Sequence, residues 1–181
     1  MTVRRVTSAS YRDDRDAAKS EPMAFRALMA AFPTGVAVIT TTASDGRPRG
    51  MTCSSVCSVT LSPPTLLICL RQSSPTLAAI QWRSTFTVNL LHDGAQRTAA
   101  LFASGAPERF DLVRWHMGAG YGGPHLSDDS HAFADCRVSH VEQVGDHTVV
   151  FGEALRLLRR SGRRPLLYGL RGYRSWPGEI S

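Results

Sequence analysis

Short segments rich in β-branched residues, separated by brief turn signals, constrain this sequence more than any other feature. Asp45-Gly46 is a typical two-residue hairpin turn, and Gly145-Asp146 and Ser161-Gly162 separate later segments in the same way. The pattern predicts about seven strands, at residues 35–42, 50–59, 65–70, 85–91, 131–143, 147–158 and 165–170. We therefore expect a mainly β fold, a barrel of antiparallel hairpins with a few short helices, and not a doubly wound sheet.

Three short helices are expected between the strands. The apolar spacing between Phe25 and Phe32 predicts a first helix, which Pro33 ends. Ser74, as a cap before a proline, predicts the start of a second helix. A capping box over residues 93–96 predicts a third.

The chain is expected to form one domain with an N-terminal extension. Residues 1–20 are polar and charged and lack apolar periodicity, so we expect a disordered arm there. The other residues, 21–181, are expected to form the domain, since 43% of the 181 residues are hydrophobic. No apolar run is long enough to span a bilayer and no secretory signal is recognisable, so we expect a cytoplasmic location and no membrane partner.

The net charge of +6 is concentrated near the C-terminus, where residues 155–181 hold seven cations and one anion. Arginine forks grip phosphate, which would fit nucleic acid or a phosphorylated cofactor, whereas charges beside a turn are commonly only solvated. Four of these arginines flank the Ser161-Gly162 turn, and no aromatic cluster accompanies them as in a base-stacking platform. We therefore expect no nucleic-acid partner.

Several motifs that would carry other chemistry are disfavoured. The four cysteines include no C-x-x-C pair; Cys53 and Cys57 would share a strand face, but no histidine lies near them in sequence, so buried thiols are favoured and no metal is predicted. Residues 118–123 match a dinucleotide fingerprint, yet Pro124 follows where a helix would have to begin, so they are interpreted as a loop. Hydrolase and P-loop motifs are absent from the sequence.

Two stretches are suited to a flat, phosphorylated ligand. Residues 51–58 are mostly small or hydroxyl-bearing, so a flat ring could lie against them, although close packing against a strand or subunit would need the same residues. Ser73, Ser74 and Thr76 stand at a helix start, where free backbone N–H groups favour an anion, although a plain helix cap would look the same.

Read in order along the chain, several motifs resemble one known family. They include Phe32-Pro-Thr-Gly-Val-Ala-Val-Ile-Thr40, Met51-Thr-Cys-Ser-Ser-Val-Cys-Ser-Val59, Phe86-Thr-Val-Asn-Leu-Leu91, Phe102, Arg109-Phe110, Gly145-Asp-His147 and Pro165-Leu-Leu-Tyr168. Together they resemble the short-chain flavin reductases, the reductase components of two-component flavin-dependent monooxygenases. The resemblance implies a flavin-binding split β-barrel over residues 21–181 that works as a homodimer.

The resemblance also implies an activity and a binding site. The expected enzyme is an NADH-dependent flavin reductase that uses FAD (or FMN) and NADH (or NADPH) and passes reduced flavin to a partner monooxygenase. Ser74 and Thr76 would hold phosphate, and His147 would face the nicotinamide. Many members of the family have Asn where Ser54 stands. The implied cofactor-binding residues are Pro33, Thr34, Gly35, Thr52, Cys53, Ser54, Ser55, Val56, Cys57, Ser58, Ser74, Thr76, His147, Arg171 and Tyr173.

The chemistry of such a reductase needs no protein nucleophile, because the cofactors themselves exchange the hydride, and no catalytic side chain is predicted. Two other functions stay open. One is a non-enzymatic flavin carrier or sensor on the same barrel. The other is a pyridoxamine-phosphate-oxidase-like enzyme on a related barrel, which residues 51–64 disfavour by their resemblance.

Overall fold

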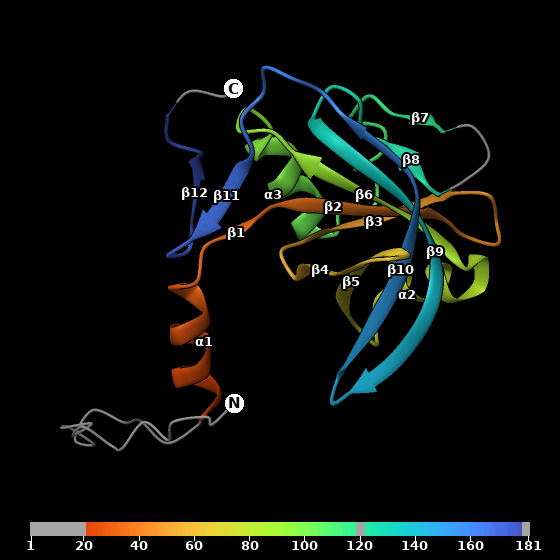
Figure 1. Ribbon diagram of the computed structural model, residues 1–181, viewed down its shortest axis with the longest axis horizontal. Helices are drawn as coiled ribbons and strands as arrows, with labels where there is room; N and C mark the ends of the chain where they lie inside the picture. The colour runs from red at the N-terminus through yellow and green to blue at the C-terminus, as the bar shows by residue number, and fades with distance from the viewer. Residues whose placement is uncertain (1–20, 119–121, 179–181) are drawn as a thin grey trace, which may run out of the picture.

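A seven-stranded antiparallel sheet forms most of the molecule in the computed structural model, which describes residues 21–118 and 122–178 (Figure 1). The strand order is β3-β2-β6-β9-β10-β5-β4. The strands are β2 (Ala37–Thr42), β3 (Pro48–Cys53), β4 (Val56–Leu61), β5 (Pro64–Arg71), β6 (Thr85–Leu91), β9 (Ser130–Val144) and β10 (His147–Arg159). The predicted mainly β class with a few short helices is confirmed.

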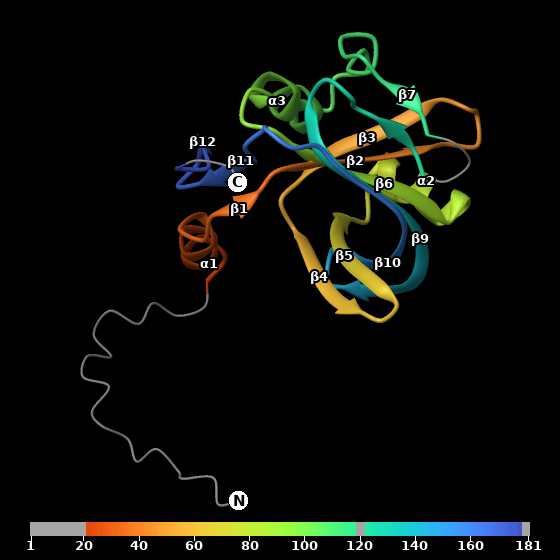
Figure 2. The ribbon, with the colours of Figure 1, turned by 45° about the horizontal axis from the view of Figure 1, so that its top comes forward.

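The two edges of this sheet are consecutive in the chain. Only Ser54 and Ser55 separate the end of β3 from the start of β4. The sheet coils strongly (Figure 2), yet no ladder joins β3 to β4 among the described strands, so hydrogen bonding does not close it into a barrel. The chain therefore passes from one edge of the sheet to the other through two small residues.

Two smaller sheets flank the large one. β1 (Thr34–Gly35), β11 (Leu166–Gly169) and β12 (Gly172–Ser175) form one, and β7 (His116–Met117) pairs with β8 (Pro124–His125) in the other. Val36 separates β1 from β2, so the predicted strand at residues 35–42 is in fact two strands in different sheets. Pro124 begins a strand and not a helix, as expected if the glycine-rich motif is a loop; its residues 119–121 lie outside the described part.

β2 is buried on both faces, and this explains its continuous β-branched run. Ala37 and Ile39 pack into a core that includes residues of α2 (Pro75–Arg83). Val36 and Val38 pack on the other side, against residues of α3 (Gln96–Ser104). The alternation of side chains along an extended strand thus serves two cores at once.

α1 (Pro22–Ala30) stands apart from the sheet and has no buried residue (Figures 1 and 2). Its predicted apolar stripe is exposed: Phe25 is 60% and Leu28 is 67% accessible in this single chain. The predicted arm at residues 1–20 lies outside the described residues. Among the residues the structure describes, no helix is long and apolar enough to cross a membrane.

The helix starts follow the sequence only in part. Ser74 is the N-cap of α2, as predicted, with its side chain accepting from the backbone of Leu77. The capping box predicted for residues 93–96 is wrong, because α3 begins with Ala95 as N-cap and without a side-chain cap. Here the backbone N–H of Gly94 instead donates to the His92 ring at 3.0 Å.

Candidate functional site

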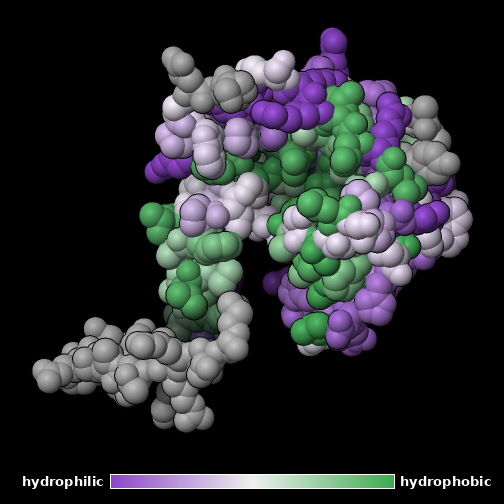
Figure 3. All heavy atoms as spheres, viewed as in Figure 1, coloured by the Kyte–Doolittle hydropathy of each residue, from purple (hydrophilic) through white to green (hydrophobic). Residues whose placement is uncertain are grey.

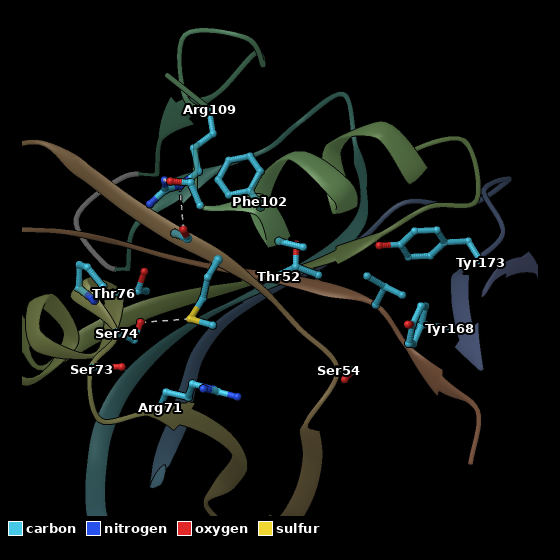
Figure 4. A pocket seen from close by; sticks show the side chains of 16 residues that line it. Thr52, Ser54, Arg71, Ser73, Ser74, Thr76, Phe102, Arg109, Tyr168 and Tyr173 are labelled. Atoms are coloured by element: carbon cyan, nitrogen blue, oxygen red, sulfur yellow. Dashed lines mark hydrogen bonds between the residues drawn. The ribbon is translucent and has the colours of Figure 1, made fainter. Parts of the chain in front are cut away.

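Two clefts adjoin at the short link between β3 and β4. The first cleft, of 510 Å³, lies between β3, the turn before α2, the end of α3 and the β11–β12 hairpin (Figure 4). The second cleft, of 930 Å³, lies between α1, the start of β4 and the end of β5. Ser54 and Tyr168 line both clefts, so two ligands placed in them would be neighbours.

Hydroxyl groups and a helix N-terminus gather at one end of the first cleft, where Ser73, Ser74 and Thr76 lie together (Figure 4). The Ser74 hydroxyl accepts from the Leu77 N–H at 3.4 Å and donates to the Met51 sulfur at 3.2 Å. Thioether sulfur is a weak acceptor, so this hydroxyl can turn its hydrogen to an anion and keep the cap. Because the positive end of the α2 dipole points here, this end is suited to phosphate.

The end of β3 forms one wall of the first cleft. The Thr52 hydroxyl donates to the Ala99 carbonyl of α3 at 2.6 Å, so it ties this wall to the helix. Cys53 lines neither cleft; its side chain lies in the core, where burial raises the pKa of the thiol. Ser54 follows it and returns to the cleft surface.

Arg109 reaches the first cleft from the segment after α3 and is held by three backbone carbonyls. Its Nε donates to Gly50 at 3.0 Å, and its Nη1 donates to Gly105 at 2.9 Å and to Ala106 at 2.6 Å. Burial, with the nearby Arg49 charge, lowers the pKa of Arg109. A guanidinium stays protonated in proteins, so Arg109 brings a fixed positive charge to this cleft.

Aromatic rings form the opposite end of the first cleft from the hydroxyl groups (Figure 4). Tyr168 of β11 and Tyr173 of β12 have ring centroids 5.3 Å apart. Burial, followed by the proximity of Tyr168, raises the pKa of Tyr173. Such ring faces are suited to packing against a flat ligand.

The second cleft collects the predicted residues at the start of β4. Thr34, Arg171 and the residues at positions 54–57 line it. Pro33 and Gly35 line neither cleft; Pro33 lies so near the β11–β12 hairpin that a Cβ on Gly169 would be 3.2 Å from its Cα. Ser58 lines a separate, largely apolar pocket of 410 Å³ between β4 and the β9–β10 hairpin.

His147 lines neither cleft but is held beside the first one. It pairs across β5 and β10 with Arg71, which lines that cleft. Gln72 donates from its backbone to Asp146 at 3.0 Å and from its side chain to Gly145 at 2.9 Å, which fixes the turn. His147 Nδ1 lies 2.7 Å from an Asp146 carboxylate oxygen, and this hydrogen bond lowers the pKa of Asp146.

The expectation that Cys53 and Cys57 share a strand face is wrong. They lie on different strands, β3 and β4, and the first is buried whereas the second is exposed. Within residues 21–118 and 122–178, no group of three or more His, Cys, Asp or Glu side chains is arranged to hold a metal ion.

The sequence matches the family model of the flavin reductase like domain over residues 29–177. The chain belongs to the flavin reductase family. A flavin reductase (NADPH) of Lentzea aerocolonigenes is 47% identical over 166 residues, which cover 92% of this chain and 96% of that protein. The reductase subunit HsaB of a flavin-dependent monooxygenase from Rhodococcus jostii is 38% identical over 148 residues, which cover 82% of this chain and 74% of the relative.

A solved structure of the same family has the same fold. The NADH:FAD oxidoreductase SgcE6 of Streptomyces globisporus, in complex with NAD and FAD fragments, matches this flavin reductase with a TM-score of 0.80. The two chains are 32% identical, and the match covers 93% of this chain and 98% of that one.

Sequence reasoning did not single out Arg71, Phe102 or Arg109 as site residues of this flavin reductase, although all three line the first cleft. Arg71 lies opposite His147 only through the pairing of β5 with β10, two strands distant in sequence, so no local pattern indicates it. Arg109 belongs to the residues of the resemblance, but its place in the cleft depends on carbonyls of β3 and of the turn after α3.

Proposed function

We propose that this flavin reductase transfers a hydride from nicotinamide C4 of NADH or NADPH to N5 of a flavin, with NADH and FAD as the favoured pair. The observation that carries the proposal is the adjacency of the two clefts at Ser54 and Tyr168. Relatives support it, since the Lentzea protein is named for NADPH and the Streptomyces structure is an NADH:FAD oxidoreductase. Neither name decides which nucleotide this chain prefers, so both stay in the experiment.

The chemistry of the first cleft fits a flavin nucleotide. Ser74, Thr76 and the α2 N-terminus would hold phosphate, and Arg71 adds a positive charge beside them. Thr52 and Ser54 present small side chains that leave room for a flat ring. Tyr168 would contact the far end of the same ligand.

The flavin, when bound, accepts the hydride that a reduced nicotinamide gives up. The protein binds both partners, orients them and excludes water, which requires reacting atoms about 3–3.5 Å apart. Ser54 and Ser55, at the border of the clefts, are small enough for such an approach. Arg109 ties β3 to the segment after α3 through its hydrogen bond to the Gly50 carbonyl.

His147 is assigned to the nicotinamide side. Its Nδ1 faces the Asp146 carboxylate, which only accepts hydrogen bonds, so Nδ1 carries a hydrogen. The side chain is 41% exposed and stands beside Arg71 at the rim of the first cleft. We propose that its Nε2 forms a hydrogen bond with the nicotinamide amide group, which offers both a donor and an acceptor.

We also propose that the protein works as a homodimer. α1 has no buried residue, and its Phe25 and Leu28 lie outside both clefts. Every residue of β4 after Val56 is exposed, and Leu61 is 86% accessible beside the apolar pocket of the β9–β10 hairpin. Figure 3 shows hydrophobic side chains along α1 and over the lower part of the sheet. A second copy would cover these surfaces.

The acceptor of the reduced flavin is proposed to be a separate monooxygenase component. The support is the relative HsaB, named as the reductase subunit of a flavin-dependent monooxygenase. A reductase of this kind gives up its product, so the flavin would act as a diffusing substrate.

The test measures oxidation of NADH or NADPH under anaerobic conditions with FAD, FMN or riboflavin supplied. The readout is the loss of the reduced-nicotinamide absorbance. Flavin-dependent oxidation of either nucleotide is expected. Varying both substrates then separates a ternary complex from a ping-pong scheme. If neither nucleotide is oxidised while flavin remains tightly bound, the reductase proposal fails and the carrier alternative stands.

A further inference from the structure

Among the residues that the structure describes, two arginines and no acidic residue line the second cleft. Arg26 comes from α1, and Arg171 comes from the turn between β11 and β12. No carboxylate of the described residues forms an ion pair with either of them. Within the described part of the chain, both guanidinium groups are therefore available to an anion brought by a ligand.

The left-handed backbone conformation at Arg171 indicates a functional role for its side chain. Leu170 and Arg171 form the two-residue loop between Gly169 and Gly172, with φ of 48° and 61°. Two consecutive left-handed residues in a hairpin loop strongly favour Asn-Gly, because Cβ atoms are strained there. The chain nevertheless carries a leucine and an arginine at these positions. Strain of this kind is frequent at ligand-binding segments.

The same turn is fixed to α1 near Arg26. The Leu170 N–H donates to the Ala30 carbonyl at 2.6 Å. Arg26 and Ala30 are four residues apart in the sequence, so they lie on the same side of the helix, and both line the second cleft. Arg26 and Arg171 thus reach one region of the cleft from two elements that are hydrogen-bonded to each other.

We propose that Arg26 and Arg171 together bind a phosphate of the pyridine dinucleotide in the second cleft. The inference rests on the proposed function and adds the group that recognises the reductant. A flavin phosphate is not the ligand, because the hydroxyl groups suited to it lie at the opposite end of the first cleft from Tyr168, where the clefts meet (Figure 4). The phosphate is either the diphosphate bridge, shared by NADH and NADPH, or the 2′-phosphate of NADPH.

Binding of redox-inactive fragments tests the proposal without turnover. ADP-ribose carries the diphosphate and adenosine 2′,5′-bisphosphate carries the 2′-phosphate; each is titrated calorimetrically into the full-length protein. Arg171→Gly and Arg26→Gln should each raise the dissociation constant of at least one fragment by about tenfold. Glycine suits the left-handed turn, so Arg171→Gly should melt at the same or a higher temperature. Arg174→Gln is the matched control, since Arg174 lies on the same hairpin but lines neither cleft.

The fragment that responds identifies the phosphate. Weaker ADP-ribose binding assigns the diphosphate, and weaker bisphosphate binding alone assigns the 2′-phosphate; either supports the proposal. Unchanged constants for both fragments in the two variants, or an equal loss in Arg174→Gln, would overturn it. Failure of the proposed function is distinguishable, because the unmodified chain would then oxidise neither NADH nor NADPH with any flavin.

Discussion

Replacing Ser74 by aspartate separates its two roles, the helix cap seen in the structure and the phosphate contact proposed for it. The Ser74 hydroxyl accepts from the Leu77 N–H at the start of α2. Ser, Asn and Asp are similarly good N-cap residues, so Ser74→Asp and Ser74→Asn should both retain the cap. The two variants differ only in charge, and the charge would face the phosphate end of the first cleft.

The size of the effect follows from Coulomb's law. A carboxylate about 4 Å from one phosphate charge is repelled by about 1 kcal/mol in water and about 4 kcal/mol at an effective dielectric of 20. This range corresponds to a rise in the flavin KM of between about fivefold and several hundredfold. Ser74 is only partly buried, so we expect the lower part of the range.

The assay compares the KM values for FMN and riboflavin, which differ only by the phosphate, and follows urea unfolding in parallel. Ser74→Asp should raise the FMN value and leave the riboflavin value near that of the wild type. Ser74→Asn should change neither by more than a few-fold, and Ser74→Ala should lower the unfolding free energy by about 1 kcal/mol. An unchanged FMN constant in Ser74→Asp, or an equal rise in the riboflavin constant, would refute the phosphate assignment. An unfolded aspartate variant would refute the reasoning about the cap.

Three further predictions concern the core, the turn and the dimer. Gly152→Ala should lower the free energy of unfolding by about 1–3 kcal/mol, measured as a lower urea midpoint, because its Cβ would lie 2.5 Å from the buried Phe86 ring. His147→Ala should raise the KM for NADH and not for flavin. It should also return the pKa of Asp146 toward its ordinary value, measured by carboxyl NMR titration, because the His147 hydrogen bond that lowers that pKa is removed. A carboxyl group whose pKa is lowered by folding stabilises the fold above its ordinary pKa, and this stabilisation is lost as the pH falls through the pKa of the folded state. The stability of His147→Ala should therefore depend less on pH in that window. Leu28→Glu should yield monomers by light scattering, and a dimer that persists would place the interface elsewhere.

The strands could be predicted from the sequence because their signals are local. Asp45-Gly46 makes the hairpin of β2 and β3, and the turn before His147 joins β9 and β10. The double burial of β2 was consistent with its unbroken β-branched run. A run of this kind does not reveal that Val36 pairs with two other strands, bonding to Leu166 and Leu91, because those residues are distant in sequence.

The site could be predicted only where a residue type was decisive by itself. Ser74 was recognisable because a hydroxyl before a proline marks a helix start. For Cys53 the resemblance assigns the whole segment to the ligand, whereas the structure places this side chain in the core, so its contact with a ligand stays a prediction. Phe102, in α3, and Arg109, after it, reach the cleft through tertiary packing, which no local pattern specifies.

The arginines of the basic C-terminal region occupy two different structural settings, although the net charge counts them together. The turn around Ser161-Gly162 lies outside both clefts; there Arg160 donates to the Ser127 carbonyl, and the Arg164 carbonyl accepts from the Asp93 N–H. These arginines therefore brace the surface. Arg171, only seven residues further on, lies in a left-handed turn that favours glycine and lines the second cleft. One stretch thus holds arginines at a surface turn and the arginine that we propose binds phosphate, and the two groups differ in backbone conformation although net charge counts them together.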